Sequence, residues 1–168
     1  MKKILVTGGC GYIGSHTSLA LLEKGYELVI VDSLVNSFPI VVEKIKKILN
    51  KSLPDIENQI HLKKCDLCDF NLLKNVFQEF SGDNPISAVI HFAGLKAVSE
   101  SISFPLRYWE NNVLGTINLL RVMDEFNCRN IVFSSSATVY KAKSDSLINE
   151  NDICNPINPY GYTKLTIE

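Results

Sequence analysis

Short aliphatic runs alternate with longer amphipathic runs along this chain of 168 residues. Five runs of β-branched or aliphatic residues, each bounded by turn or polar residues, are predicted as strands: Ile4–Thr7, Leu28–Val31, Ile60–Lys63, Ala88–Phe92 and Ile131–Ser134. The amphipathic runs predict helices at Tyr12–Lys24, Phe38–Asn50, Asn71–Phe80, Pro105–Asn127 and Tyr160–Glu168. Because strands that alternate with helices pair in parallel, the pattern predicts the α/β class and a doubly wound parallel sheet that is incomplete with five strands.

The longest predicted helix has clear end signals. Ser103 is placed to cap it, with Pro105 in its first turn. Four apolar residues recur at helical spacing and form one face, which we expect to pack on the sheet or on a partner helix: Trp109, Val113, Ile117 and Leu120. Lys51–Glu57 is predicted to be a surface connection and Lys141–Asn158 a longer polar loop of the kind that often carries function.

Charge and hydropathy exclude several classes of protein. Seventeen basic and eighteen acidic residues leave a net charge of −1, so the protein has no overall positive charge to attract nucleic acid or an anionic membrane. The apolar stretch Ile4–Val6 near the N-terminus is too short for a signal peptide or a membrane span. We therefore expect a cytoplasmic protein.

The cysteines and histidines do not form a recognisable metal or nucleophilic motif. Five cysteines are an odd number scattered through strand and loop patterns, which is typical of free thiols in a reducing compartment. Cys65 and Cys68 form an isolated C-x-x-C pair, without the two further ligands of a zinc site or the helix of a thioredoxin motif. The spacing of His16, His61 and His91 indicates structural roles.

A glycine-rich turn follows the first strand directly. Gly8, Gly11 and Gly14 stand where the chain turns into the first helix. Glycines allow a tight turn and a close approach of backbone N–H groups to a pyrophosphate, toward which the helix N-terminus directs a positive dipole. A tight turn without a ligand would also explain three glycines alone.

Asp32, at the end of the second strand, favours a turn that binds a dinucleotide over a tight turn without a ligand. It lies eighteen residues beyond Gly14, close to the spacing of the carboxylate that binds an adenosine ribose in dinucleotide-binding βαβ units. The same charge would repel a 2′-phosphate, and Cys10 in the turn offers no cation to attract one. The sequence therefore predicts NAD, rather than NADP, as the cofactor.

Four later segments make a more specific resemblance possible: Phe92–Val98 (FAGLKAV), Asn111–Thr116 (NNVLGT), Ser134–Tyr140 (SSSATVY) and Asn158–Lys164 (NPYGYTK). With the glycine spacing, they resemble the UDP-glucose 4-epimerases of the extended short-chain dehydrogenase/reductase family over essentially the whole chain. Related sugar-nucleotide 4,6-dehydratases tend to carry Thr-Asp-Glu where this chain has Ser135-Ser136-Ala137, so the resemblance favours epimerisation over dehydration. The chain departs from the family at Ser33, where Asn is usual, and at Lys141, where Gly is usual.

The resemblance implies the positions of cofactor and substrate. It assigns the pyrophosphate to the glycines with Tyr12 and Ile13, and the remaining cofactor contacts to Asp32, Asn36, Ser37, Asp66, Leu67, Phe92, Ala93, Lys96, Asn111, Tyr160 and Lys164. Asp32, Asn36 and Ser37 would surround the adenosine ribose, and Asp66 and Leu67 the adenine. Lys96, Ser136 and Tyr160 would contact the sugar.

The resemblance also implies a mechanism. An unactivated carbon that bears a hydroxyl cannot be inverted by removing its own proton, so the carbon is first oxidised to a ketone and then reduced from the other face. Tyr160 would remove the 4′-hydroxyl proton, and Lys164, one helical turn further on, would provide the positive charge that a phenolic base needs at neutral pH. Ser136 would hydrogen-bond the same hydroxyl, and Lys164 would bind the nicotinamide ribose.

We therefore expect residues 1–168 to be the NAD-binding Rossmann domain of an epimerase acting on UDP-glucose and UDP-galactose, truncated before its last strands and a C-terminal substrate domain. Members of the family are usually homodimers through the long helix and the Tyr-Lys helix. The chain alone is expected to have little activity. Two alternatives stay open: a related UDP-sugar epimerase acting on N-acetylated or uronic sugars, and an NAD-binding module without catalysis.

Overall fold

The computed structural model describes residues 1–141 and 147–168 and contains one five-stranded parallel sheet. Its strand order is β3-β2-β1-β4-β5, with strands at Lys3–Thr7 (β1), Glu27–Asp32 (β2), Ile60–Lys64 (β3), Ile86–His91 (β4) and Ile131–Phe133 (β5). The central strand β1 pairs with strands on both sides: Val6 is opposite Ile30 on one side and Ile90 on the other. The predicted Rossmann-type α/β sheet and its five strands are confirmed, with ends that differ by one or two residues.

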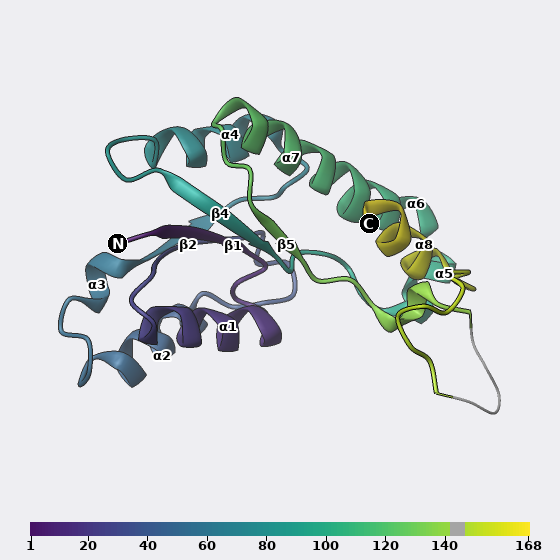
Figure 1. The fold of residues 1–168 in the computed structure, drawn as a ribbon, viewed down its shortest axis with the longest axis horizontal. Helices are drawn as coiled ribbons and strands as arrows, with labels where there is room; N and C mark the ends of the chain where they lie inside the picture. The colour runs from purple at the N-terminus through teal and green to yellow at the C-terminus, as the bar shows by residue number, and fades with distance from the viewer. Residues whose placement is uncertain (142–146) are drawn as a thin grey trace.

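Helices cover both faces of the sheet (Figure 1). Helices α1 (Tyr12–Glu23) and α2 (Ile40–Leu49) lie on one face, and α4 (Phe70–Glu79) and α7 (Gly115–Glu125) on the other. Because successive side chains of a strand point to opposite faces, β1 contributes to two separate cores. Leu5 packs with residues of α4 and α7, whereas Ile4 and Val6 pack with residues of α1 and α2.

Two short helices were not predicted. Helix α3 (Ile56–Gln59) begins within the predicted surface connection, and its Ile56 is buried in the core beneath α2, so the connection is not wholly at the surface. Helix α5 (Val98–Ser103) precedes the long helix. The prediction that Ser103 caps the long helix is therefore wrong: Ser103 ends α5, and Phe104 precedes Pro105 without a side-chain cap.

The predicted long helix is a continuous path of three parts. Helix α6 (Pro105–Tyr108) leads into the π-helical segment η1 (Trp109–Leu114), which leads into α7. A π segment holds an extra residue per turn, and such segments occur frequently at functional sites. The π segment contains the adjacent residues Asn111 and Asn112. Asn111 lines the cavity described below, and Asn112 is buried.

The apolar face predicted on this helix does not pack on the sheet. Trp109, Ile117 and Leu120 are between 37% and 47% exposed. The neighbouring face is buried instead, and it combines apolar residues with polar ones such as Thr116 and Asn118. Both polar side chains are hydrogen-bonded inside the protein, which periodicity of hydrophobic residues alone could not reveal.

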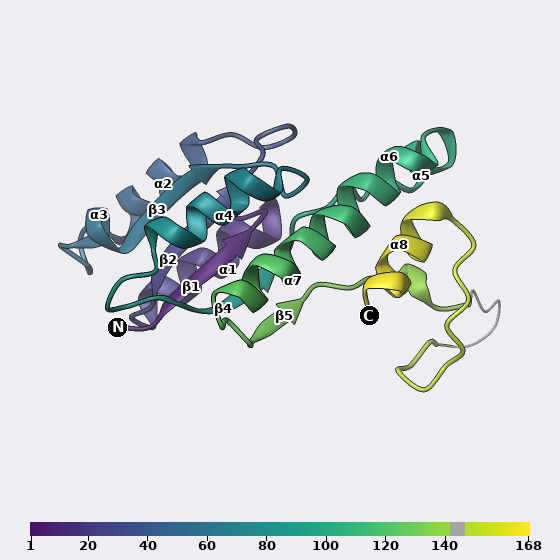
Figure 2. The same ribbon diagram turned by 90° about the horizontal axis from the view of Figure 1, so that it is seen from above.

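The C-terminal part of the chain extends beyond the sheet. Strand β5 leads through the 3₁₀ turn η2 (Ala137–Val139) to helix α8 (Pro159–Ile167), which lies beyond the end of the sheet (Figure 2). Helix α8 packs beside α5, α6 and η1. Of the predicted loop between them, residues 142–146 lie outside the described residues, and Tyr140 forms a single antiparallel bridge with Cys154. Within the described residues, no helix has the length and hydropathy needed to cross a membrane.

Candidate active site

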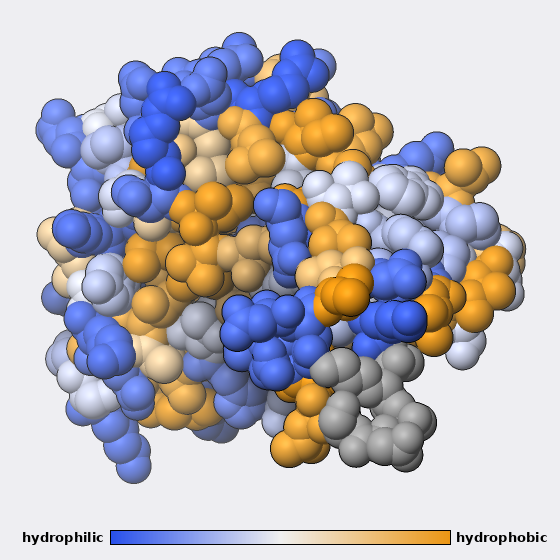
Figure 3. Space-filling model, turned by 45° about the vertical axis from the view of Figure 1, so that its right-hand side comes forward, coloured by the Kyte–Doolittle hydropathy of each residue, from blue (hydrophilic) through white to orange (hydrophobic). Residues whose placement is uncertain are grey.

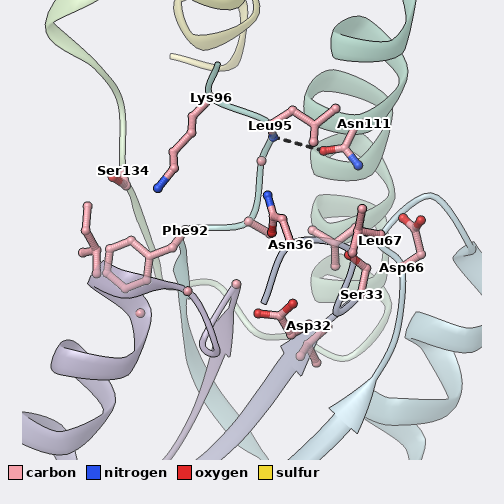
Figure 4. Close-up of a pocket in the computed structure, with 18 of the residues that line it drawn as sticks. Asp32, Ser33, Asn36, Asp66, Leu67, Phe92, Leu95, Lys96, Asn111 and Ser134 are labelled. Atoms are coloured by element: carbon pink, nitrogen blue, oxygen red, sulfur yellow. Dashed lines mark hydrogen bonds between the residues drawn. The ribbon is translucent and has the colours of Figure 1, made fainter. Parts of the chain in front are cut away.

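A cavity of about 340 Å³ lies at the carboxyl ends of the strands (Figure 4). Fifteen of the residues predicted to contact cofactor or substrate line it: Gly8, Gly11, Tyr12, Ile13, Gly14, Asp32, Asn36, Asp66, Leu67, Phe92, Ala93, Lys96, Asn111, Tyr160 and Lys164. Ser37 and Ser136 do not line it. Ligands of open α/β sheets bind at this edge, so the position of the cavity fits a binding site.

The glycine turn has no room for a side chain at Gly8 or Gly14. A Cβ on Gly8, whose φ is +66°, would lie 2.7 Å from the Ala93 amide nitrogen, and one on Gly14 would lie 2.3 Å from the Gly8 carbonyl oxygen. Gly11 is the N-cap of α1 and provides no side-chain cap, so no side chain of its own covers the first N–H groups of the helix. The turn is therefore a fitting cradle for an anionic pyrophosphate.

The Asp32 carboxylate is only 7% exposed and is held from three directions. Its Oδ1 accepts from the Leu34 amide and the Ser37 hydroxyl, and its Oδ2 accepts from the Cys10 amide at 2.9 Å. A carboxylate has about four acceptor positions, so one position on Oδ2 is left for a ribose hydroxyl. Ser37 thus contacts the carboxylate rather than the cavity.

The middle of the cavity is formed by the segment that follows β4. The Leu95 amide donates to Asn112 Oδ1 at 2.8 Å and to Asn111 Oδ1 at 3.3 Å, the second of which is the dashed line in Figure 4. Asn112 Nδ2 returns a hydrogen bond to the Leu95 carbonyl and another to Thr163 Oγ1. This pairing fixes the segment that carries Lys96, whose ammonium points toward the side of Ser134 and Phe92 in Figure 4.

A buried histidine links this segment to β1. His91 Nδ1 lies 2.6 Å from Thr7 Oγ1, and its Nε2 lies 2.9 Å from Thr116 Oγ1. The Thr116 hydroxyl donates to the Asn112 carbonyl, so its oxygen accepts from the ring and Thr7 donates to Nδ1. Burial, with Lys164 nearby, lowers the pKa of His91 to about 3, which keeps the ring neutral. The structure therefore supports the structural role predicted for His91.

Lys164 is a buried cation at the far end of the cavity. Its side chain comes from α8, is 4% exposed and donates to the Ser134 carbonyl at 2.9 Å. The ammonium lies 4.6 Å from the centre of the Phe133 ring and 6.0 Å from that of Tyr160. Burial lowers the pKa of Lys164 to about 8, because a desolvated ammonium is costly to keep charged. A ligand with hydroxyl or carboxylate oxygens would regain part of that solvation.

Tyr160 lies in the first turn of α8, which is firmly defined. Asn158 caps the helix by accepting from the Gly161 amide at 2.8 Å, and Pro159 occupies the first helical position. The Tyr160 ring is 9% exposed and packs edge-on against buried Tyr108, with 6.4 Å between ring centres. The phenol is thus held in place against the cavity wall.

Ser136 is positioned differently. It is the N-cap of η2, where its hydroxyl accepts from the Thr138 amide at 3.2 Å and pairs with the Thr138 hydroxyl at 2.9 Å. The structure therefore brings Tyr160 and Lys164 together at the cavity but leaves the Ser136 hydroxyl bonded to its own turn.

Several residues of the cavity wall were missed by sequence reasoning: Val31, Val35, Cys65, Gly94, Leu95, Arg107, Ser134 and Ser135. Most are immediate neighbours of predicted residues, so their position along the chain could have indicated them. Arg107 has no such signal, since it comes from the short helix α6 and pairs with Glu100 at 2.7 Å. Among the described residues, no group of three or more His, Cys, Asp or Glu side chains could hold a metal ion.

The chain is similar in sequence to enzymes that act on sugar nucleotides. The family model for GDP-mannose 4,6 dehydratase matches residues 5–168. The chain is 50% identical to the bifunctional protein GAL10 of Pachysolen tannophilus and 48% identical to the UDP-glucose 4-epimerase of Bacillus subtilis, with 100% and 98% of the chain covered. It spans only 23% and 45% of the lengths of these two relatives.

Solved structures agree with the sequence comparison. A crystal structure of UDP-glucose 4-epimerase from Bifidobacterium longum, in complex with NAD⁺ and UDP, superimposes with a TM-score of 0.87 and 41% sequence identity. The match covers 99% of this chain and 47% of that structure. The chain therefore belongs to the NAD-dependent epimerase/dehydratase family that the GDP-mannose 4,6 dehydratase model describes, and it is similar to the N-terminal portion of UDP-glucose 4-epimerases.

Proposed function

We propose that this chain binds NAD and is the cofactor-binding half of a UDP-glucose 4-epimerase. One observation carries the proposal: a single cavity joins the glycine turn and Asp32 at one end with Tyr160 and Lys164 at the other. A βαβ phosphate cradle alone would suit many nucleotides. A phenol and a buried ammonium at the opposite end add the groups needed to move a proton at a hydroxyl-bearing carbon.

In the proposed reaction, the protein handles the proton. NAD, when bound in this cavity, would supply the reversible hydride chemistry that the reaction needs. Tyr160 takes the proton of the 4′-hydroxyl as the ketone forms and gives it back as the hydroxyl re-forms. Lys164 stabilises the phenolate by its charge, and its burial excludes water that would screen that charge. Reactant and product are UDP-glucose and UDP-galactose, so there is no net oxidation.

The proposed role of Ser136 requires an exchange of partners. Its hydroxyl now bonds to Thr138, so it would have to rotate to reach the sugar hydroxyl. A serine hydroxyl donates one hydrogen bond and accepts others, so it can exchange Thr138 for a sugar hydroxyl as its partner. Lys96, which already points into the cavity, needs no such change.

We propose that substrate binding needs residues outside this chain, and that a second copy of the protein packs on the long helix. The relatives are at least twice as long as the region matched, and we assign the binding of the uridine diphosphate to their C-terminal part. The half-exposed Trp109, Ile117 and Leu120 on the long helix suit the proposed homodimer contact. Figure 3 shows hydrophobic side chains exposed among hydrophilic ones on one face of the molecule. Free cysteines, found throughout the described residues, fit a cytoplasmic location.

The decisive experiment is turnover by a full-length protein that contains this sequence. We expect conversion of UDP-glucose to UDP-galactose with no added reductant. Conversion of UDP-N-acetylglucosamine or of a UDP-uronic acid without conversion of UDP-glucose would favour the related epimerases. Binding of NAD without turnover of any UDP-sugar, and no effect of Tyr160→Phe, would favour a non-catalytic NAD module. The chain of 168 residues is expected to bind NAD but not to turn over.

A further inference from the structure

The turn that follows β3 contributes one wall of the cavity without belonging to any helix or strand. Cys65, Asp66 and Leu67 of this turn line the cavity, at the end to which we assign the adenine. Its internal hydrogen bonds run from the Asp69 amide to the Asp66 carbonyl and from the Cys68 amide to Asp66 Oδ1. These bonds shape the turn, and the Cys65 amide ties its first residue to the Asp32 carbonyl of β2 at 3.0 Å.

Asn118 of α7 holds the later part of the turn, at Leu67 and Cys68. Its side-chain amide donates to the Leu67 carbonyl at 3.0 Å and to the Cys68 carbonyl at 3.1 Å. Asn118 is 4% exposed and stands beside Leu119, which is fully buried. Burial of an amide without hydrogen bonds costs free energy. The two hydrogen bonds therefore stabilise the folded position of the Asn118 side chain and of the Leu67 and Cys68 carbonyls.

Two further contacts from the same helical path reach the turn. A Cβ on Gly115 would lie 3.2 Å from Leu67 Cβ, so the turn packs closely against the helix backbone at that point. The Cys68 thiol donates to the Glu110 carbonyl of η1 at 3.4 Å. Burial and nearby acidic groups raise the pKa of Cys68 to about 11, so the thiol keeps the proton that it donates. Burial likewise raises the pKa of Cys65 to about 12, so the C-x-x-C pair has a structural explanation in which both thiols stay protonated.

We propose that Asn118 is a positioning residue for adenine recognition: it holds the Asp66–Leu67 turn at the depth and orientation at which the turn can select the base. This inference rests on the proposed binding of NAD and goes beyond it by naming a residue that lies outside the cavity. The Asp66 carboxylate can accept only, so it selects a base with an amino group, as in adenine, over one with a carbonyl, as in hypoxanthine. That selectivity requires the turn to be held in place.

The test compares two dinucleotides that differ only at the base: NAD and nicotinamide hypoxanthine dinucleotide. Their affinities are measured calorimetrically for the wild type, Asn118→Leu and Val122→Ala. Val122 is fully buried on the same helix one turn further on, and its truncation destabilises α7 without removing a hydrogen bond to the turn. The ratio of the two affinities is informative because partial unfolding lowers both by the same factor.

We expect the wild type to prefer NAD and Val122→Ala to keep that preference. In Asn118→Leu the preference should fall about tenfold, the effect of losing one hydrogen bond of ordinary strength. If Asn118→Leu does not fold, Asn118→Ser leaves room for water at the two carbonyls and should show the same fall. An unchanged preference in a folded Asn118 variant would overturn the positioning role alone. Failure of the wild type to bind NAD would instead overturn the proposed function.

Discussion

The two ends of the cavity are built in different ways. The end assigned to the adenosine diphosphate comes from β1, the glycine turn, α1 and the end of β2, which are contiguous between residues 3 and 37, together with the Asp66–Leu67 turn after β3. The other end combines the segment after β4, the π segment η1, the segment after β5 and helix α8, which extend from residue 92 to residue 164. The first end depends on backbone geometry, and the second on side chains that meet across long distances in the chain.

This difference explains how a substitution should act at each end. A backbone cradle is lost when a Cβ is added, because there is no rotamer by which the Cβ can avoid the clash. A site made of side chains can lose one function and keep the others.

The largest effect is expected at Gly14. The Gly14→Val side chain would press its Cβ to 2.3 Å from the Gly8 carbonyl oxygen, so the turn must open. We expect a loss of NAD affinity of at least about 100-fold and a loss of about 2 kcal/mol or more in the free energy of unfolding. Calorimetric titration and urea denaturation measure the two effects.

The matched control for this change is Gly82→Ala. No atom lies within 4 Å of a Cβ built at Gly82, so affinity and stability should be unchanged. Normal NAD binding by Gly14→Val would show that the pyrophosphate lies elsewhere.

At the opposite end, Tyr160→Phe should separate chemistry from binding. Removal of the phenolic hydroxyl from the full-length enzyme should lower kcat by about 10²–10⁴-fold, the usual contribution of an acid–base group. The affinity for NAD should change little, because the ring still packs against Tyr108. Tyr162→Phe, at a neighbouring and exposed position, is the control and should retain full activity. Comparable turnover by the Tyr160 and Tyr162 variants would exclude Tyr160 as the base.

Lys164 should make stability depend on pH. Its pKa is lowered from the ordinary 10.5 to about 8 by burial, so between these values the folded chain binds fewer protons than the unfolded chain. The free energy of unfolding should therefore rise with pH across this window, by on the order of 2 kcal/mol. Lys164→Met should lack this rise, whereas exposed Lys51→Met should retain it. Parallel pH profiles for the wild type and Lys164→Met, measured by urea denaturation, would contradict the buried charge.

The smallest effects are expected at two helix caps, one at each end of the cavity. Asp69 caps α4 beside the adenine turn, and Asn158 caps α8 beside Tyr160. Replacement of either by Ala should cost about 1 kcal/mol in the free energy of unfolding. Asn158→Ala should in addition lower kcat a few-fold, whereas Asp69→Ala should leave kcat at saturating NAD unchanged. Equal effects on kcat would show that the two ends are not independent.

Features built from neighbouring residues could be predicted from the sequence, whereas features built from distant segments could not. The sheet, its strands and the glycine turn followed from local patterns, since aliphatic runs and glycines act within a few residues. The π segment, α5 and the cap of the long helix did not, because they depend on contacts with distant segments. The buried face of α7 was missed because it includes Thr116 and Asn118, whose hydrogen-bond partners lie far away in sequence.

The site residues divide along the same line. The positions of Tyr160 and Lys164 followed from their resemblance to a known motif, and the structure places both at the cavity. Arg107 at the cavity wall and the engagement of Ser136 with Thr138 could not be inferred from either pattern or resemblance. Both depend on how α6 and η2 are oriented in the folded chain.

The most direct test of the account is a calorimetric comparison of NAD and NADP binding to the chain of residues 1–168. The buried Asp32 carboxylate, already held by three donors, should accept a ribose hydroxyl and repel a 2′-phosphate. We predict that NAD binds with one site per chain and that NADP binds at least about tenfold more weakly. Equal affinities for the two dinucleotides, or no binding of NAD, would contradict the central claim that this cavity is an NAD site.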